Sequence, residues 1–342
     1  MLDTGLSMDA VSVVLVWTAV AVYTLAFIAY TIDLARRSDL AIKAKDAVDA
    51  RVLVGVGAGT GGHGGLAERG PDELEVAPSQ RPRYLWARIG TSLTVLGLVF
   101  HIAADVMRGI AAGRVPWSNM YEFALTGTML VVAVYLVVLF RYDLRFLGSF
   151  VTGLSIVLLG GAALAYYVEV VPLADPLKSV WLVIHVFVAS LATAVFALAF
   201  ALSVLQLMQA RRQRLTAAAV GDDAVAGKTG PRFLRTLPGA DALESLAYRF
   251  AIVGFILWTF TLIAGSIWAN DAWGRYWGFD TKEVWTFVIW TLYAGYIHAR
   301  ATRGWRGTRS AWLSIIGFSA VIFNFTIVNQ FFKGLHVYSG LS

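Results

Sequence analysis

The sequence predicts an all-α integral membrane protein with about eight transmembrane helices and one tryptophan-rich segment on the outer side. The 342 residues are 58% hydrophobic and only 15% charged, and the mean hydropathy is +0.67. So few charges would be unusual in a soluble chain. Apolar runs long enough to cross a bilayer recur along the sequence, and Lys and Arg gather between alternate runs. We interpret residues 1–342 as a single polytopic membrane domain.

Eight apolar runs are the candidates for these helices. They cover residues 9–33, 85–108, 119–140, 146–167, 178–209, 247–268, 284–303 and 311–331. The first run lacks a basic start and a small-residue cleavage site, so we expect a retained helix and not a signal peptide. The run at 178–209 exceeds the length that a bilayer needs, which predicts that it tilts or projects into the cytosol.

Two longer polar stretches separate some of these runs. Residues 34–84 surround a glycine-rich centre with a formal G-x-G-x-x-G pattern at Gly57, Gly59 and Gly62. No strand pattern precedes these glycines and no amphipathic helix follows, so a flexible linker-like loop is favoured over a dinucleotide site. Residues 210–246, which contain Gly-Pro and Pro-Gly pairs, form a second predicted loop.

The distribution of basic residues predicts the orientation. The connections on one side of the membrane hold 21 Lys and Arg residues, and those on the other side hold six. The basic side should be cytoplasmic, which places the loops 34–84 and 210–246 inside and both termini and the segment 269–283 outside. The expected location is the plasma membrane, or the thylakoid membrane of a plastid or cyanobacterium. The net charge of +6 is then a topology signal and predicts no nucleic-acid partner. Without cysteines, the chain can have no disulfide or thiolate chemistry of its own.

The tryptophan-rich segment is the strongest functional signal. Residues 268–298 hold five of the twelve tryptophans, with charged groups among them. Polar-edged rings are typical of a membrane interface, so an anchoring belt is one interpretation. A belt, however, needs no Asp-x-Lys-Glu in its middle. The rings around Asp280 also suit a flat apolar surface for a planar ligand such as haem.

Three histidines complete the candidate site. His185 lies near the outer end of its helix, and His336 lies in the outer tail, so two imidazoles bracket the segment and could ligate one iron. His298 follows about fifteen residues into its helix, roughly 22 Å from the outer side, where an ionisable residue is a functional candidate. For His101 we expect an ordinary hydrogen bond within the bundle.

The segment WGRYWGFDTKEVWTFVIWTLYAGYIH resembles the WWD motif of haem-handling membrane proteins, namely the CcsA (ResC), CcmC and CcmF proteins. The residues that match the pattern are Trp273, Gly274, Trp277, Asp280, Lys282, Glu283, Trp285, Trp290, Tyr293, Tyr296 and His298. Three positions differ, since Tyr276 replaces Phe, Phe279 replaces Trp and Thr281 replaces Pro. The second change removes an indole N–H donor from the motif.

This resemblance implies System II cytochrome c maturation. His185 and His336 would ligate haem b, the transported substrate, over a surface that includes Trp273, Trp277, Asp280 and Trp285. His298 would belong to an inner haem site whose other ligand comes from a ResB/CcsB-like partner. The CcsA–CcsB haem lyase would then join haem to the Cys-x-x-Cys-His thiols of apocytochrome c, which a thiol-reducing partner supplies in reduced form. Charge complementarity alone suggests Arg275 and Lys282 as propionate partners.

Other interpretations stay open. A CcmC-like haem exporter or chaperone without ligation activity is one, although such chains are shorter. A non-haem transporter is another, although no inverted repeat is visible. A second family-like pattern, P-x-x-N-x-Y-E from Pro116 to Glu122, is equally explained by capping of the following helix, with Asn119 as cap and Glu122 three residues later.

Overall fold

The computed structural model describes residues 7–57, 85–173, 177–218, 230–302, 304–332 and 334–335, and for 41–57 the backbone only. His63, Gly59 and Gly62 lie outside the described residues, as do the rest of residues 58–84 and residues 219–229 of the two predicted loops. His336 also lies outside them, although its predecessor Leu335 is described.

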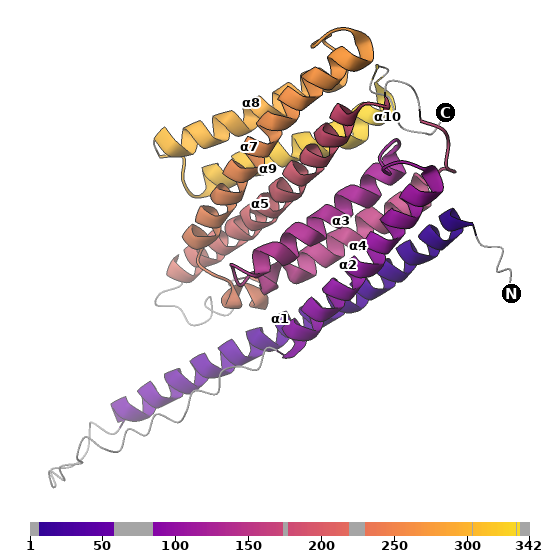
Figure 1. The fold of residues 1–342 in the computed structure, drawn as a ribbon. Coiled ribbons are helices and arrows are strands. Elements are labelled where there is room, and N and C mark those ends of the chain that lie inside the picture. Colours follow the sequence, from indigo (N-terminus) through magenta and orange to yellow (C-terminus); the bar gives the residue numbers. More distant parts are fainter. Residues whose placement is uncertain are drawn as a thin grey trace, which may run out of the picture.

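The described residues form helices and no strand, which confirms the predicted fold class (Figure 1). The long helices are α1 (Met8–Gly57), α2 (Leu85–Ala112), α3 (Met120–Leu139), α4 (Gly148–Ala165), α5 (Val180–Ala218), α7 (Ala240–Trp273), α8 (Thr281–Thr302) and α9 (Thr308–Phe323). Short helical turns precede α4 and α7, and α9 continues through a π-helical turn, Asn324–Val328, into α10 (Asn329–Phe331).

Each of the eight predicted runs corresponds to one long helix. Within the described part of the chain, seven helices are long and apolar enough to cross a membrane. The exception is α8, which has 22 residues but includes Lys282, Glu283, His298 and Arg300. These side chains lower its hydropathy, although α8 packs beside α7 and α9 like the other helices (Figure 1).

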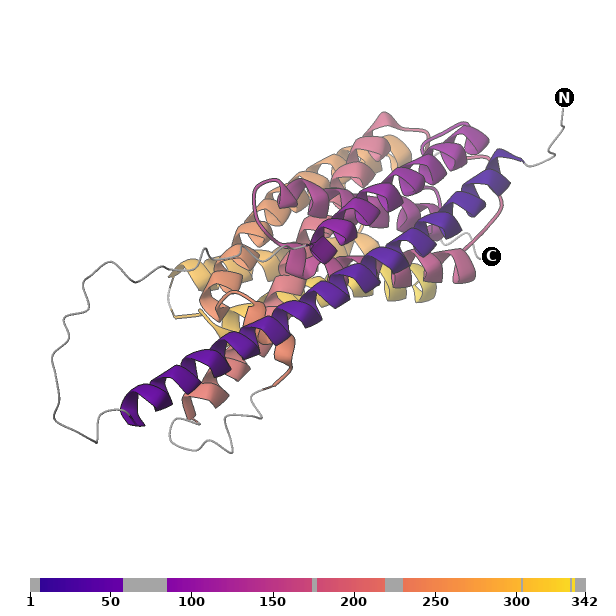
Figure 2. The same cartoon turned by 90° about the horizontal axis from the view of Figure 1, so that it is seen from below.

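Helix α1 differs from the prediction, because it continues to Gly57 where a polar loop was expected from residue 34. A hydropathy pattern measures the apolar length of a helix and not its full length, since polar residues can also be helical. Asp33 stabilises this junction twice: it forms an ion pair with Arg37 one turn later, and it accepts a hydrogen bond of 3.1 Å from the backbone N–H of Ala87 in α2. Figure 2 shows α1 extending past the ends of its neighbours.

Helices α1 to α4 pack together through close contacts between tyrosine and glycine. The ring of Tyr30 lies between α2 and α4, against Gly90 and Gly148. A Cβ atom at Gly148 would lie only 2.5 Å from this ring, so the α1–α4 contact requires a residue without a side chain.

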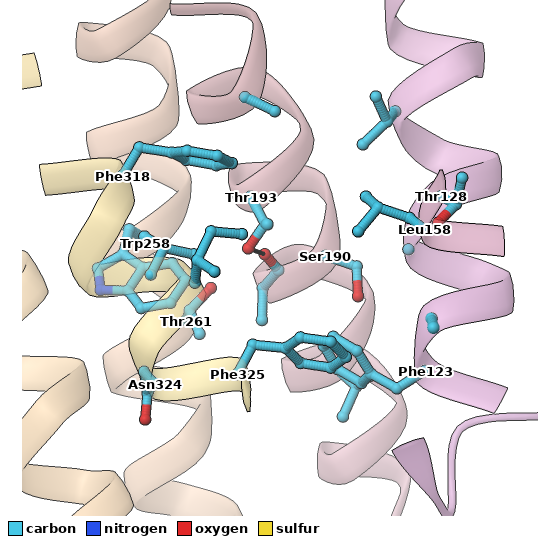
Figure 3. Close-up of a pocket in the computed structure, with 18 of the residues that line it drawn as sticks. Phe123, Thr128, Leu158, Ser190, Thr193, Trp258, Thr261, Phe318, Asn324 and Phe325 are labelled. Carbon is cyan, nitrogen blue, oxygen red and sulfur yellow. Dashed lines mark hydrogen bonds between the residues drawn. The ribbon is translucent and has the colours of Figure 1, made fainter. Parts of the chain in front are cut away.

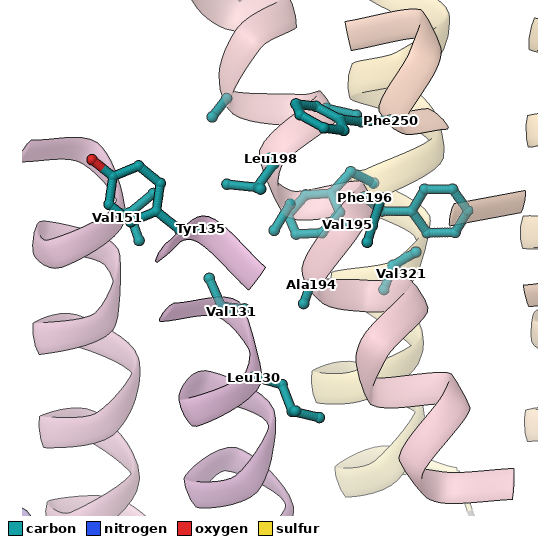
Figure 4. Packing of buried hydrophobic residues seen from close by; sticks show 14 of the residues in the cluster. Leu130, Val131, Tyr135, Val151, Ala194, Val195, Phe196, Leu198, Phe250 and Val321 are labelled. Atoms are coloured by element: carbon teal, nitrogen blue, oxygen red, sulfur yellow. The ribbon is translucent and has the colours of Figure 1, made fainter. Parts of the chain in front are cut away.

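Helix α5 lies at the centre of the remaining helices and contacts α3, α7 and α9. Phe196 of α5 is fully buried and stacks on Tyr293 of α8, with ring centroids 3.7 Å apart. Figure 4 shows Phe196 between Phe250 and Val321 in this core. The core therefore joins α8, the less apolar helix, to the centre of the bundle.

Polar contacts identify which helix ends meet. Arg108 at the end of α2 binds Asp9 at the start of α1 (2.6 Å). Ser179, next to α5, donates to Asp271 of α7 (3.2 Å). Tyr166, after α4, accepts from Gln330 of α10 (2.6 Å). These ends form one face of the bundle, which also carries the connection from α7 to α8; we call it the motif end.

Candidate functional site

The tryptophan-rich segment folds as a tight turn of residues 274–280, the motif turn, between α7 and α8. Gly274 ends α7 with φ of 69°, and its N–H donates to Asn270 (2.9 Å). This left-handed end is typical of a glycine C-cap. Phe279 also has a positive φ, 56°, which is rare for a residue with a bulky side chain.

Glu283 in the first turn of α8 holds the motif turn in shape. Its Oε2 accepts hydrogen bonds from the backbone N–H groups of Gly278 (2.8 Å) and Asp280 (3.2 Å). The side chain of Arg275 crosses the turn directly over Gly278, where any Cβ atom would overlap the guanidinium. One buried nitrogen of Arg275, Nη1, has no hydrogen-bond partner among the described residues. The turn thus holds a guanidinium in place with donor capacity left over.

A pocket of about 80 Å³ lies directly beneath the motif turn, and we call it the motif pocket. Its walls come from α5, α7, the turn itself and α8. They are lined by His185, Thr261, Leu262, Gly265, Ser266, Trp268, Ala269, Tyr276, Trp277, Lys282, Glu283 and Thr286. The structure therefore brings His185 and Trp277 together as predicted, although 92 positions separate them in the sequence.

The orientation of His185 is fixed by α7. Its Nδ1 lies 2.9 Å from the carbonyl oxygen of Thr261. A carbonyl oxygen can only accept, so Nδ1 carries the proton and the neutral ring has its lone pair on Nε2. This is the tautomer that ligates a metal through Nε2, with the other ring nitrogen bonded to a backbone carbonyl. Gly265 permits the approach, because a Cβ atom there would lie 2.7 Å from Cε1 of His185.

Trp268 was not among the predicted site residues, yet it packs directly on His185. The two rings are stacked, with centroids 5.9 Å apart and an angle of 21° between the planes. Trp268 is 2% exposed and also contacts Trp273 edge-on at 4.9 Å. The sequence did contain one indication that Trp268 belongs to the site, because it is the first residue of the tryptophan-rich segment. The roles of Thr261 and Gly265 left no such signal, because each depends on a contact between helices.

The predicted aromatic surface is only partly assembled in the structure. Trp277 lines the motif pocket and contacts Phe279 and Phe287 edge-on. Trp273 does not line the pocket; it packs edge-on against Trp268 as part of a small apolar cluster. Trp285 does not line the pocket; it packs on Phe323 of α9, with ring centroids 4.5 Å apart.

Asp280 and Lys282 connect the motif turn to the C-terminal part of the chain. Oδ1 of Asp280 accepts a hydrogen bond from the backbone N–H of Leu335 (3.2 Å). The ammonium group of Lys282 donates to the side-chain oxygen of Asn329 in α10. Lys282 therefore points into the bundle, whereas Arg275 lies across the turn.

A larger cavity of about 190 Å³ adjoins the motif pocket and shares His185, Thr261, Lys282 and Thr286 with it. Figure 3 shows its walls, with Phe123 and Phe325 at one end and Trp258 and Phe318 at the other. Most of its lining is apolar. The exceptions include Ser190 and Asn324, each with a buried oxygen that has no hydrogen-bond partner in the described part of the chain.

The two remaining described histidines differ sharply in environment. His101 is fully buried, with Nε2 3.0 Å from the carbonyl oxygen of Leu125 and Nδ1 3.3 Å from the hydroxyl of Tyr23. This confirms the expected hydrogen bond within the bundle. His298 lies on the exposed face of α8, in line with Thr291 and away from the motif pocket.

Comparison with known proteins gives a consistent result. The family described as "Cytochrome C assembly protein" matches residues 117–336. The cytochrome c biogenesis protein CcsA of Guillardia theta is 34% identical over 263 residues, covering 74% of this chain and 86% of that protein. CcsA of Synechococcus elongatus is 33% identical over 282 residues, covering 73% and 87%. The structure of "Cytochrome c Heme Lyase CcmF" aligns with a TM-score of 0.60 at 12% identity, over 95% of this chain and 48% of that one, which indicates a shared fold.

Proposed function

This chain belongs to the cytochrome c assembly protein family, and we propose that it presents haem b at the motif end for attachment to apocytochrome c. Its curated relatives are CcsA proteins, and the match extends over most of their length. The motif end would face outward, as the distribution of Lys and Arg predicts. Haem is the substrate here, because the protein receives it and passes it on.

The orientation of His185 carries this proposal. The carbonyl of Thr261 keeps the proton of His185 on Nδ1 and the lone pair on Nε2, the nitrogen that would bind iron, whereas both ring nitrogens of the fully buried His101 take part in hydrogen bonds within the bundle. Trp268 stacks on the ring and restricts its rotation. Together these contacts preorganise Nε2 as an axial ligand, which reduces the entropy lost when iron binds. His336 would supply the opposite ligand.

Charge and shape support the remaining assignments. Arg275, held over Gly278 with a buried nitrogen that has no hydrogen-bond partner among the described residues, would bind a haem propionate. Lys282 is the weaker candidate, since it already donates to Asn329. The motif pocket, at about 80 Å³, is smaller than a cavity that holds benzene. A whole haem, which is larger than benzene, does not fit inside the pocket as it stands.

The chain would act within a larger assembly. It has no cysteine, so the thiols that add to the haem vinyl groups are those of the apocytochrome, kept reduced by another protein. The chain contributes orientation and axial ligands, while haem and the substrate thiols supply the reaction. A ResB/CcsB-like membrane protein would complete the lyase and supply the second ligand of an inner haem at His298.

The test replaces the preorganised ligand. We expect His185→Ala, co-expressed with a ResB-like partner, to lose at least tenfold in cytochrome c assembly, and added imidazole to restore part of it by occupying the vacated position. The absorption spectrum of the purified complex reports haem content per mole of folded protein. His101→Ala is the matched control, because it removes a buried imidazole outside the motif pocket; it should leave the haem content per folded protein unchanged. Full assembly by His185→Ala would refute the proposal.

A further inference from the structure

A groove at the end of the bundle opposite the motif end has no part in the proposed haem site. It measures about 690 Å³ and lies between the start of α2 and the end of α3. Three arginines line it, namely Arg88, Arg141 and Arg145, and we call it the basic groove. The distribution of Lys and Arg predicts that this end of the bundle faces the cytoplasm.

The basic groove carries positive charge that no described residue neutralises. Arg145 donates two hydrogen bonds of 2.6 Å to the carboxylate of Asp143, so the acidic residue of the groove neutralises one of its three arginines. Among the described residues, neither Arg88 nor Arg141 has an ion-pair partner, and both are exposed. Two guanidinium groups are therefore left to bind an anion, and their planar forks suit the oxygens of a phosphate group.

One face of α2 joins this charge to an apolar surface. Arg88 and Ser92 are one turn apart, and the same face continues toward the motif end through Val95, Val99 and Val106. All five residues are exposed. The distance from Val95 to Val106 is about 16 Å along the helix axis, roughly half of a hydrocarbon core of about 30 Å. This face therefore changes from basic to apolar over the depth of one membrane leaflet.

Helix α3 supplies a second apolar wall. Leu136 and Leu139 line the groove, and so does Phe140, which directly follows the helix and is 91% exposed. Such a ring is better placed against acyl chains than in water. A small soluble anion would use only the guanidinium groups and leave this wall uncovered. The groove therefore fits an amphipathic anion, with its charge at the arginines and its apolar part along α2 and α3.

We propose that the basic groove binds an anionic phospholipid. Arg88 and Arg141 bind its phosphate, and the apolar residues of α2 and α3 hold its acyl chains. Arginines beside a membrane attract anionic lipids, and basic pockets between transmembrane helices bind their headgroups. A lipid bound here joins α2 to α3 at the end remote from the motif pocket. The site uses no histidine and no residue of the motif turn, so it does not depend on the proposed function.

The first experiment measures which lipid stays bound. Native mass spectrometry of the full-length protein, with equal amounts of phosphatidylglycerol and phosphatidylcholine, should show preferential binding of phosphatidylglycerol. Arg88→Gln combined with Arg141→Gln should weaken that binding roughly tenfold, because two charges are lost. Arg249→Gln is the matched control, since Arg249 is exposed near the start of α7 at the same end but outside the groove, and it should change nothing. Equal binding of the two lipids, or an equal loss in the control, would overturn the proposal.

A soluble competitor distinguishes a lipid site from a phosphate site. Glycerol 3-phosphate has the phosphate group and no acyl chain, so at equal concentration it should not displace phosphatidylglycerol. If it does, the groove binds soluble anions and the apolar walls have no role. The substituted arginines are exposed, so each variant should keep the wild-type Tm, and a loss of binding then reports on the groove and not on folding.

The second experiment locates the lipid in a bilayer. The chain has no cysteine, so a fluorophore can be attached at Val137→Cys beside the groove, or at Val253→Cys on α7 as the control; both positions are exposed. Phosphatidylglycerol with a spin-labelled acyl chain should quench the fluorophore at position 137 more than spin-labelled phosphatidylcholine does. Arg88→Gln with Arg141→Gln should remove this difference, and at position 253 the two lipids should quench equally. Equal quenching at position 137 in the otherwise unchanged protein would refute the site.

Discussion

Glu122 is the residue that explains the second family-like pattern, P-x-x-N-x-Y-E. Asn119 does cap α3, by accepting from the N–H of Glu122 (2.9 Å). The carboxylate of Glu122, however, accepts from the N–H of Ser118 (2.9 Å) and forms ion pairs with Arg108 (3.0 Å) and Arg114 (2.7 Å). Capping therefore accounts for the asparagine, whereas the glutamate joins the ends of α2 and α3.

This network also reaches α1 and the segment after α4. Arg108 is fully buried, and its other nitrogens donate to Asp9 (2.6 Å) and to the carbonyl of Val168 (2.8 Å). Tyr167 donates to the same Asp9 (2.6 Å). Desolvation, and then this hydrogen bond, raises the pKa of Tyr167, so its phenol remains a donor at neutral pH.

Replacing Glu122 should therefore destabilise the whole motif end. Glu122→Ala leaves Arg108 buried with one of its two carboxylate partners missing, which costs about 3–5 kcal/mol when a buried pair is broken. Thermal unfolding in detergent would show this as a lowered Tm. Asp143→Ala is the matched control, because Asp143 forms a more exposed ion pair with Arg145 (2.6 Å) and should cost at most about 1 kcal/mol. Equal Tm values for the two variants would contradict the role assigned to Glu122.

Single residues also show how far the site could be predicted. The sequence predicted the tryptophan-rich motif from its local residue pattern. It also predicted that His185 and Trp277 lie at the same side of the membrane, because the distribution of Lys and Arg gives the orientation of the helices. Thr261 and Gly265 were not predicted, since their role arises only where α5 meets α7. Trp285 stays a prediction: motif membership suggests a place in the haem surface, and in this structure its ring packs on Phe323 of α9.

At the scale of elements, the contact of α1 with α2 and α4 depends on the ring of Tyr30 between two glycines. Gly148→Ala should force this ring or the helix to shift, and overpacking of this kind costs about 1–3 kcal/mol. Gly161→Ala in the same helix is the matched control, because no atom lies within 4 Å of a Cβ placed there. A fall in Tm for Gly148→Ala alone would confirm the packing, whereas equal values would show that α1 adapts at no cost.

Element boundaries were the least predictable part of the fold. Hydropathy located all eight long helices but not their polar ends: α5 continues to Ala218 and α7 begins at Ala240, both inside the predicted loop 210–246, and α1 and α8 also depart from the pattern. Helix α1 continues beyond the end of its apolar residues. Helix α8 contains charged residues and still packs in the bundle. The π-helical turn at Asn324, a residue that lines the larger cavity, left no sequence signal.

At the scale of the whole molecule, successive helices are predicted to run in opposite directions across the membrane. The polar contacts at the motif end agree with this, because they join the start of α1 to the end of α2 and the start of α5 to the end of α7. The same arrangement separates two candidate haem sites. His185 lies at the motif end, whereas His298 lies 17 residues into α8, roughly 25 Å along its axis. Haem could not contact both at once, so an inner and an outer site would be occupied in succession or by two haem groups.

The exposed position of His298 predicts that the inner site is shared with another chain. An imidazole facing lipid is costly unless it is paired, and no described residue of this chain forms a hydrogen bond with its side chain. We expect His298→Ala, purified with a ResB-like partner, to contain less than half of the wild-type haem while its outer ligands remain in place, and imidazole to restore part of the loss. Thr291→Ala, on the same exposed face of α8, is the matched control and should keep full haem. If His298→Ala retains full haem and full cytochrome assembly, the inner site lies elsewhere and this face of α8 binds no iron.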